Sequence, residues 1–238
     1  MKNKIITIFT VILLLSGCSA MKNTSIDAGI IPLPEDKIVP LQIPKPIRTL
    51  DIYDTQLGVR VDKDILSLTS KQIRERLTTT ETVVTIEKYD GSISLGYLGA
   101  NAKAAKGRYK VTFDYVNSTI KDVSLNKNEA DTIQGRIGVG LRITVDLTTT
   151  SNGLDLSSLL PIALAVKDEK ATGTVRFLAY GLSNEKFSSL LTPTIATLSP
   201  DSIQKTIESI GAERIIFNLD ETKLEPYLLG ISSNVKKP

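Results

Sequence analysis

The sequence predicts an α+β fold with a largely antiparallel sheet and helices packed on one face of it. Between 80 and 150, apolar residues recur at every second position, as they do in strands that bury one face. Helix signals concentrate in the C-terminal half, and the strongest is Ser199-Pro200-Asp201, a cap followed by proline at the first helical position. Strands thus come first and helices enter later, which favours α+β over a regular βαβ alternation.

The clearest strand covers Gln134–Thr148 and alternates between an apolar and a polar face. The apolar face would hold Ile137, Val139, Leu141, Ile143, Val145 and Leu147, and the polar face Arg136, Gly138, Gly140, Arg142, Thr144, Asp146 and Thr148. The two glycines suggest a bulge or the close approach of another backbone. We expect a charge at Ile143 to unfold the domain, and a charge reversal at Arg142 to be tolerated.

The segments before this strand carry weaker signals. We expect a short strand at Leu50–Tyr53, a helix over Lys71–Leu77 capped by Ser70, a hairpin of Thr82–Tyr89 and Ser92–Leu98 around Asp90-Gly91, and a strand at Arg108–Asn117.

After the strand, helices and strands alternate. We expect a helix over Leu159–Val166 capped by Asp155 or Ser157, a strand at Gly173–Leu182, a short helix from Ser183 to Leu191, a helix from Ser199 that ends at Gly211, and strands at Arg214–Leu219 and Leu224–Ile231.

The N-terminus has the layout of an export signal. Lys2 and Lys4 precede an apolar run that ends in Leu15-Ser16-Gly17-Cys18, and the run is too short for a stable membrane-spanning helix. These residues resemble a bacterial lipoprotein signal, with Leu15, Ser16, Gly17 and Cys18 as its lipobox. The resemblance implies that residues 1–17 are removed and that Cys18 carries the lipid. The alternative is an ordinary secretory signal with an incidental cysteine.

The same resemblance implies a place in the cell envelope. Two or three acyl chains would hold the protein at a membrane stably, whereas one chain would be marginal. Ser19, in place of an aspartate, favours the outer membrane if the host has two membranes. The resemblance ends at residue 20, and the remainder of the chain suggests no specific family.

Three regions follow: a signal over 1–17, a lipidated proline-rich tether over 18–47 and a single domain over 48–238. The tether contains Pro32, Pro34, Pro40, Pro44 and Pro46, which disfavour helix. It is also rich in isoleucine and leucine. It is therefore either a free spacer or a segment whose later half covers apolar surface of the domain.

Composition excludes several chemistries. The chain has no histidine, which removes Ser-His-Asp catalysis and most zinc sites, and its only cysteine is the lipid-bearing one. There is no tryptophan, and the formal charge is only +3. We expect no enzymatic activity, no metal, no cofactor and no nucleic-acid partner.

One cluster of cations is a weak candidate for surface binding. Lys103, Lys106, Arg108 and Lys110 could meet acidic headgroups or other envelope carboxylates, although a solvated loop explains them more simply.

The function that these observations favour is a non-enzymatic binding or structural lipoprotein with an envelope partner. One alternative is an oligomeric pore-forming or secretion-channel lipoprotein, by analogy with curli-secretion channels. The other is a hydrolase that uses carboxylates alone.

Overall fold

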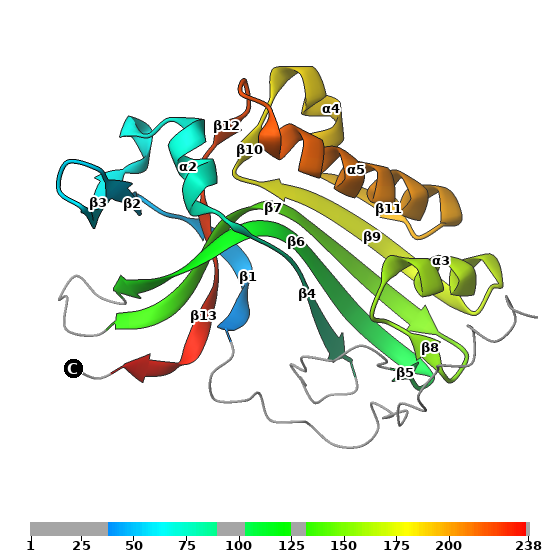
Figure 1. Cartoon of the computed structure of the whole chain (residues 1–238). Coiled ribbons are helices and arrows are strands. Elements are labelled where there is room, and N and C mark those ends of the chain that lie inside the picture. Colours follow the sequence, from blue (N-terminus) through cyan, green and yellow to red (C-terminus); the bar gives the residue numbers. More distant parts are fainter. Residues whose placement is uncertain (1–37, 90–102, 125–131, 237–238) are drawn as a thin grey trace, which may run out of the picture.

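The computed structural model of the chain describes residues 38–89, 103–124 and 132–236 (Figure 1). The predicted lipobox and Cys18, the expected lipid-bearing residue, lie outside the described residues. So do the Asp90-Gly91 turn and the strand expected at Ser92–Leu98.

A large antiparallel sheet dominates the fold, with strand order β1-β13-β7-β6-β4. Its strands are β1 (Ile38–Pro46), β4 (Thr79–Lys88), β6 (Gly107–Ser124), β7 (Thr132–Thr149) and β13 (Tyr227–Lys236). On the side away from β6, β13 pairs with the first half of β7 and β9 (Ala171–Tyr180) pairs with the second half. A last strand, β11 (Thr194–Thr197), pairs with β9.

Three two-stranded ribbons accompany the sheet. They are β2 (Thr49–Asp54) with β3 (Val59–Asp64), β5 (Lys103–Ala104) with β8 (Leu154–Asp155), and β10 (Leu182–Ser183) with β12 (Lys223–Leu224). The helices are η1 (Ile65–Ser67), α2 (Ser70–Arg76), α3 (Leu159–Lys167), η2 (Glu185–Phe187), α4 (Ser188–Leu191) and α5 (Pro200–Asn218).

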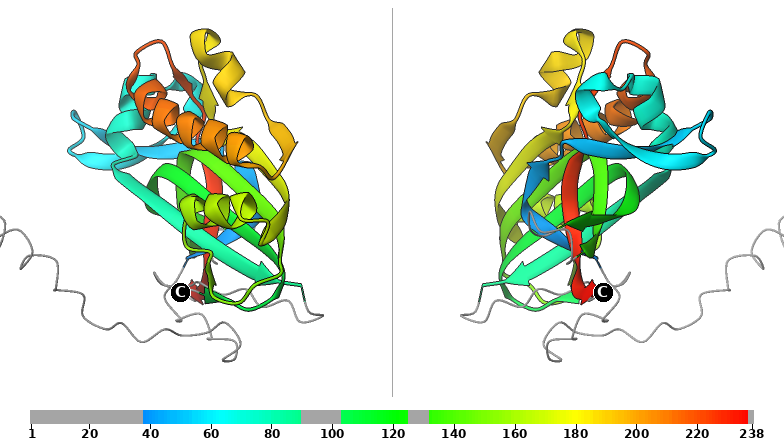
Figure 2. Two further views of the ribbon diagram at one scale, coloured as in Figure 1. Left: turned by 90° about the vertical axis from the view of Figure 1, so that its right-hand side faces the viewer. Right: turned by 90° about the vertical axis from the view of Figure 1, so that its left-hand side faces the viewer.

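The predicted fold class is confirmed: a large antiparallel sheet is combined with helices that lie mainly in the C-terminal half. Figures 1 and 2 show α3 and α5 along the same face of the sheet, over β7 and β9. The apolar face of β7 lies in this core, and the side chains from Ile137 to Leu147 on that face are at most 1% exposed.

The polar face of β7 differs from the prediction. Arg142 is only 6% exposed, and Thr144 beside it on this face is buried as well. Part of the cover comes from β1, since two of its main-chain carbonyls accept hydrogen bonds from Arg142. The expectation that Arg142 tolerates charge reversal is therefore wrong, because a side chain buried by a distant segment is not visible in the local alternation.

Gly138 and Gly140 of β7 mark close backbone approach, as predicted. A Cβ on Gly140 would lie 2.1 Å from the carbonyl oxygen of Tyr115, and its φ of +155° is one that other residues rarely adopt. Gly138 pairs with β13 and Gly140 with β9, so the partner of β7 changes between them. Both glycines let the backbones of β7 and β6 approach closely.

The predicted boundary between tether and domain is corrected by β1. Residues 38–46, assigned to the tether over 18–47, form a strand paired with β13 at the edge of the sheet. Ile38 is buried in this position. Of the two alternatives for the later tether, attachment to the domain is the one observed, and the folded part begins before residue 48.

Helix α5 is longer than predicted. It starts at the expected capping residue Ser199, but it continues through Gly211 to Asn218 and includes the strand expected at Arg214–Leu219. Its buried side continues through Ile216 and Phe217, so packing against the core outweighs the weak helix preference of one glycine.

Two other helix caps also differ by a few positions. Thr69 caps α2 through a reciprocal pair of hydrogen bonds with Gln72, and Ser70 is the first helical residue. Ser158 occupies the N-cap position of α3, rather than Asp155 or Ser157.

Candidate functional site

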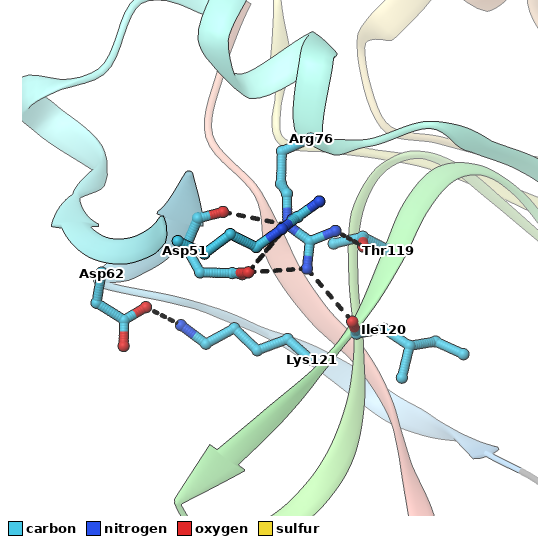
Figure 3. A network of polar contacts seen from close by, with 7 residues as sticks. Asp51, Asp62, Arg76, Thr119, Ile120 and Lys121 are labelled. Atoms are coloured by element: carbon cyan, nitrogen blue, oxygen red, sulfur yellow. Dashed lines mark hydrogen bonds and ion pairs between the residues drawn. The ribbon is translucent and has the colours of Figure 1, made fainter. Parts of the chain in front are cut away.

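A network of ion pairs and hydrogen bonds joins the β2–β3 ribbon to the main sheet (Figure 3). The guanidinium of Arg76 on α2 binds Asp51 of β2, with an Nη2–Oδ2 distance of 3.0 Å, and donates to the Thr119 hydroxyl of β6. Lys121 of β6 pairs with Asp62 of β3. Each residue of the network has a partner within it, although the buried Oδ1 atom of Asp51 accepts no hydrogen bond. The network therefore serves mainly to hold the ribbon against the sheet.

A second polar group is fully internal. Arg142 forms a bidentate pair with Asp114 of β6, at 2.6 and 2.7 Å, and donates to the carbonyls of Leu41 and Gln42 in β1 at 2.7 and 2.9 Å. Its guanidinium carbon also lies 5.4 Å from the ring centre of Tyr180. Burial lowers the pKa of Arg142, but the hydrogen bonds and charge of Asp114 outweigh it and raise that pKa. This pair fastens β1 to the sheet.

A third buried group lacks a cationic partner of this kind. Glu213 on α5 is 2% exposed and accepts a hydrogen bond from the Asn117 amide of β6 at 3.1 Å. Asn117 in turn accepts from the Thr80 hydroxyl at 2.8 Å. Burial raises the pKa of Glu213 to about 7, and the Asn117 hydrogen bond and the charge of Arg214 offset part of this rise.

The four cations singled out in the sequence do not form one free patch. Lys103 lies in β5, and Lys106 precedes β6 in an exposed position. Arg108 lies 5.0 Å from the ring centre of Tyr89, and the ammonium of Lys110 is 3.4 Å from a carboxylate oxygen of Glu87. Two of the four therefore already have partners within the domain.

A groove of about 660 Å³ lies between α5, α4 and β11. Its apolar side chains come from β9, α4 and β11, and its polar side chains come mainly from the first half of α5. The apolar lining residues are Val175, Phe177, Leu190, Ile195 and Ala196, and the polar ones are Ser189, Thr192, Thr194, Thr197, Ser199, Asp201, Ser202, Lys205, Thr206, Glu208 and Ser209. Figure 1 shows α5 lying along β11 and β9, with α4 near one end of the helix. We call this site the α5–β11 groove.

The α5 residues reach the groove because of their helical spacing. Asp201, Lys205 and Glu208 are separated by four and three positions, so they follow one side of the helix. Ile203 turns toward the core instead and is buried, and Thr206 is largely buried at the margin of the groove. Ser199 fixes where this helix starts through its capping hydrogen bond from the Ser202 amide.

The hydroxyls of the groove are bound locally. Thr206 donates to the carbonyl of Ser202 at 2.8 Å, and Ser209 donates to the carbonyl of Lys205 at 3.0 Å. These hydroxyls therefore have main-chain acceptors rather than a side-chain base, and they keep oxygen lone pairs for a ligand. The arrangement is suited to binding rather than to nucleophilic attack.

The sequence prediction included the start of α5 but missed β11, the opposite wall of the groove. Thr194–Thr197 is short, and β-branched residues between Pro193 and Pro200 were its only signal.

Among the described residues, no cluster of three potential metal-ligating side chains occurs. The helices of the described segments include none long and apolar enough to cross a membrane. Comparison of the chain with protein-family models, with curated proteins and with solved structures finds no match.

Proposed function

We propose that this protein is a lipid-anchored binding protein of the bacterial cell envelope, without enzymatic activity, and that it binds a partner in the α5–β11 groove. The observation that carries the proposal is the groove itself, an open site with an apolar floor and hydroxyl-bearing walls. A few polar groups set against apolar side chains are the usual composition of a binding pocket. Membrane attachment through Cys18 rests on the lipobox residues and their resemblance to lipoprotein signals.

The carboxylates at the groove give little support to a hydrolase. Asp201 and Glu208 are seven positions apart on one helix, so both carboxylates belong to the same wall of the groove. Hydrolysis by two carboxylates needs them roughly 5–9.5 Å apart on either side of the scissile bond. Binding of a ligand therefore accounts better for this site.

Packing also favours the binding protein over the pore-forming alternative. A strand that lines a pore must keep its apolar face for lipid. The apolar side chains of β7 instead lie under α3 and α5, and Ile143 among them has no exposed surface. The same face cannot serve both purposes in one conformation.

Anchoring can be tested directly at Cys18. We expect Cys18→Ala to leave the protein unlipidated and out of the membrane fraction, because the acylated thiol and the processing site are lost together. Globomycin, which blocks the lipoprotein signal peptidase, should cause the uncleaved form of the unaltered protein to accumulate. A Cys18→Ala chain that is still lipidated and membrane-bound would disprove the anchoring.

The groove can be tested by a photocrosslinking amino acid at Leu190 or Ala196 in the full-length protein, since Ala196 lies on the same face of the sheet as Val175. Control positions are Tyr53 and Leu57, which are exposed on the β2–β3 ribbon away from the groove. We expect a discrete crosslinked product in intact envelopes from the groove positions alone. Equal products from the ribbon positions would show that the groove is not the binding site.

A further inference from the structure

We infer that the ligand of the α5–β11 groove is an extended peptide segment with a basic side chain, which adds to the free edge of β11 as a further strand. This inference rests on the proposed function, because it specifies the partner of the same groove.

The backbone of β11 has one edge available. The Leu198 amide donates to the carbonyl of Gly173 at 2.9 Å, in register with the β11–β9 pairing. Since hydrogen-bonding direction alternates along an antiparallel strand, Thr194 and Ala196 also direct their backbone groups toward β9. Those of Ile195 and Thr197 therefore point to the other edge, where no described segment pairs with them.

A free strand edge selects for an extended backbone, since only a strand presents donors and acceptors at the matching spacing. All four residues of β11 are exposed, including Ile195 at 70%. The edge has no lysine, proline or bulge within Thr194–Thr197 to block pairing, although such devices commonly protect edges. The edge is thus open to a strand from a partner.

The groove beside this edge would hold alternate side chains of the added strand. Thr194 and Ala196 pair with Phe177 and Val175, whose side chains are buried on the helix side of the sheet. An added strand would direct every second side chain to the same side, toward α5. The groove volume of about 660 Å³ is in the range of about 300–1,000 Å³ that ligand sites occupy.

Charge specifies the ligand further. Asp201 and Glu208 contribute two negative charges to the α5 wall, Lys205 contributes one positive charge, and all three side chains are exposed. The wall therefore has a net charge of −1, from one positive and two negative groups. A ligand with one lysine or arginine would complement this wall, and complementary charge mainly sets specificity and on-rate.

The test uses the lipidated full-length protein in detergent micelles and fluorescent eight-residue peptides of alternating valine and threonine. In each peptide one position is lysine, and all eight lysine positions are included. We expect saturable binding by fluorescence polarisation, weakened at least tenfold by N-methylation of alternate peptide amides. Ile195→Pro should cause a similar loss, because it removes an outward amide but spares the ladder to β9, whereas Ile195→Val should bind normally. Asp201→Asn should weaken binding several-fold.

The outcomes separate this inference from the proposed function. Failure of all eight peptides to bind, or binding that tolerates both N-methylation and Ile195→Pro, would overturn strand addition. If crosslinking at Leu190 still yields a product in envelopes, the groove remains a binding site for another kind of ligand. N-methylation leaves the protein unchanged, so its effect is independent of any misfolding of the Ile195→Pro variant.

Discussion

Arg142 and Glu213 are buried ionisable residues in opposite situations. Arg142 is charged and fully paired, with Asp114 and two main-chain carbonyls as acceptors. Glu213 has a neutral amide as its hydrogen-bond partner, and its pKa rises because its charged form is poorly solvated. Removing the charge should therefore have opposite effects on stability at the two sites.

At Arg142 we expect Arg142→Asp to destabilise the domain by roughly 3–5 kcal/mol, because it leaves Asp114 buried beside a second carboxylate. Thr148→Asp is the matched control, since Thr148 is exposed on the same face of β7. Equilibrium denaturation should show a large loss for the first variant and a small change for the second. Equal stability of Arg142→Asp and Thr148→Asp would contradict a stabilising ion pair between Arg142 and Asp114. Ile143→Asp, on the opposite and apolar face of β7, should destabilise the domain as much as Arg142→Asp.

At Glu213 we expect stability to fall as pH rises. The pKa is raised from 4.5 to about 7 in the folded protein, so the folded state holds more protons than the unfolded state between these values. Stability is thus fully present below about 4.5, declines up to about pH 7 and is constant above it, with a total loss of at most roughly 3 kcal/mol.

The variant that checks this dependence is Glu213→Gln, which keeps the shape and the acceptor for Asn117 but cannot ionise. We expect its stability to change less between pH 4.5 and 7 and to exceed that of the unaltered protein above pH 7. Denaturant midpoints measured at several pH values would show both effects. Glu208→Gln, on the exposed side of the same helix, is the control and should leave the change of stability with pH as it is in the unaltered protein. If Glu213→Gln also leaves this pH dependence unchanged, Glu213 is not its source.

At the scale of elements, glycines have different effects according to what surrounds them. Gly211 lies inside α5, and a Cβ there would meet nothing within 4 Å. Gly140 lies in β7, where a Cβ would collide with the backbone of β6. Gly211 thus lowers the stability of a helix that has room for a side chain, whereas Gly140 is required because the backbone of β6 lies too close for a Cβ.

We expect Gly211→Ala to stabilise the protein by about 1 kcal/mol, since alanine has a higher helix propensity and the site is open. Gly140→Ala should instead destabilise it by roughly 3 kcal/mol, because the backbone of β6 or β7 must move. Thermal unfolding of the two variants compares these effects. A loss of stability in Gly211→Ala would mean that α5 is not a continuous helix at this point.

At the scale of the whole molecule, the sheet is completed by β1, the described strand nearest the proposed lipid anchor. β1 pairs with β13 along one side and supplies the carbonyls that Arg142 binds. Of the chain after Cys18, only residues 19–37 remain between the anchor and this strand. The domain would therefore be attached to the membrane through an integral strand of its own sheet.

We expect the chain 38–238 to be a stable, soluble monomer that leaves dye-loaded vesicles intact, and the chain 48–238 to aggregate or unfold more easily. Loss of β1 would expose the edge of β13 and leave Arg142 without two acceptors. Light scattering and thermal unfolding compare the two chains. Equal stability would show that β1 is dispensable, whereas ring-sized oligomers with dye release would favour the pore.

Local signals predicted much of the fold because they act within a few residues. The alternation of Gln134–Thr148 identified β7 and its buried face, and Ser199-Pro200-Asp201 identified the start of α5. For the candidate site, these signals predicted only the α5 wall of the α5–β11 groove. The free edge of β11 could not be predicted for two reasons. Four residues are too few to show a two-residue periodicity, and whether a strand lies at the edge depends on how distant strands pair in the sheet.

Local patterns in the sequence were enough to predict the α+β class, most of the long strands and the close backbone approach at Gly138 and Gly140. They also indicated the lipid anchor at Cys18, which is read from adjacent residues. Only the tertiary structure decided that Arg142 is buried, that α5 passes through Gly211 and that residues 38–46 belong to the sheet. All three features depend on contacts with residues that are far away in the chain. Such contacts produce no pattern in the local sequence from which they could be predicted.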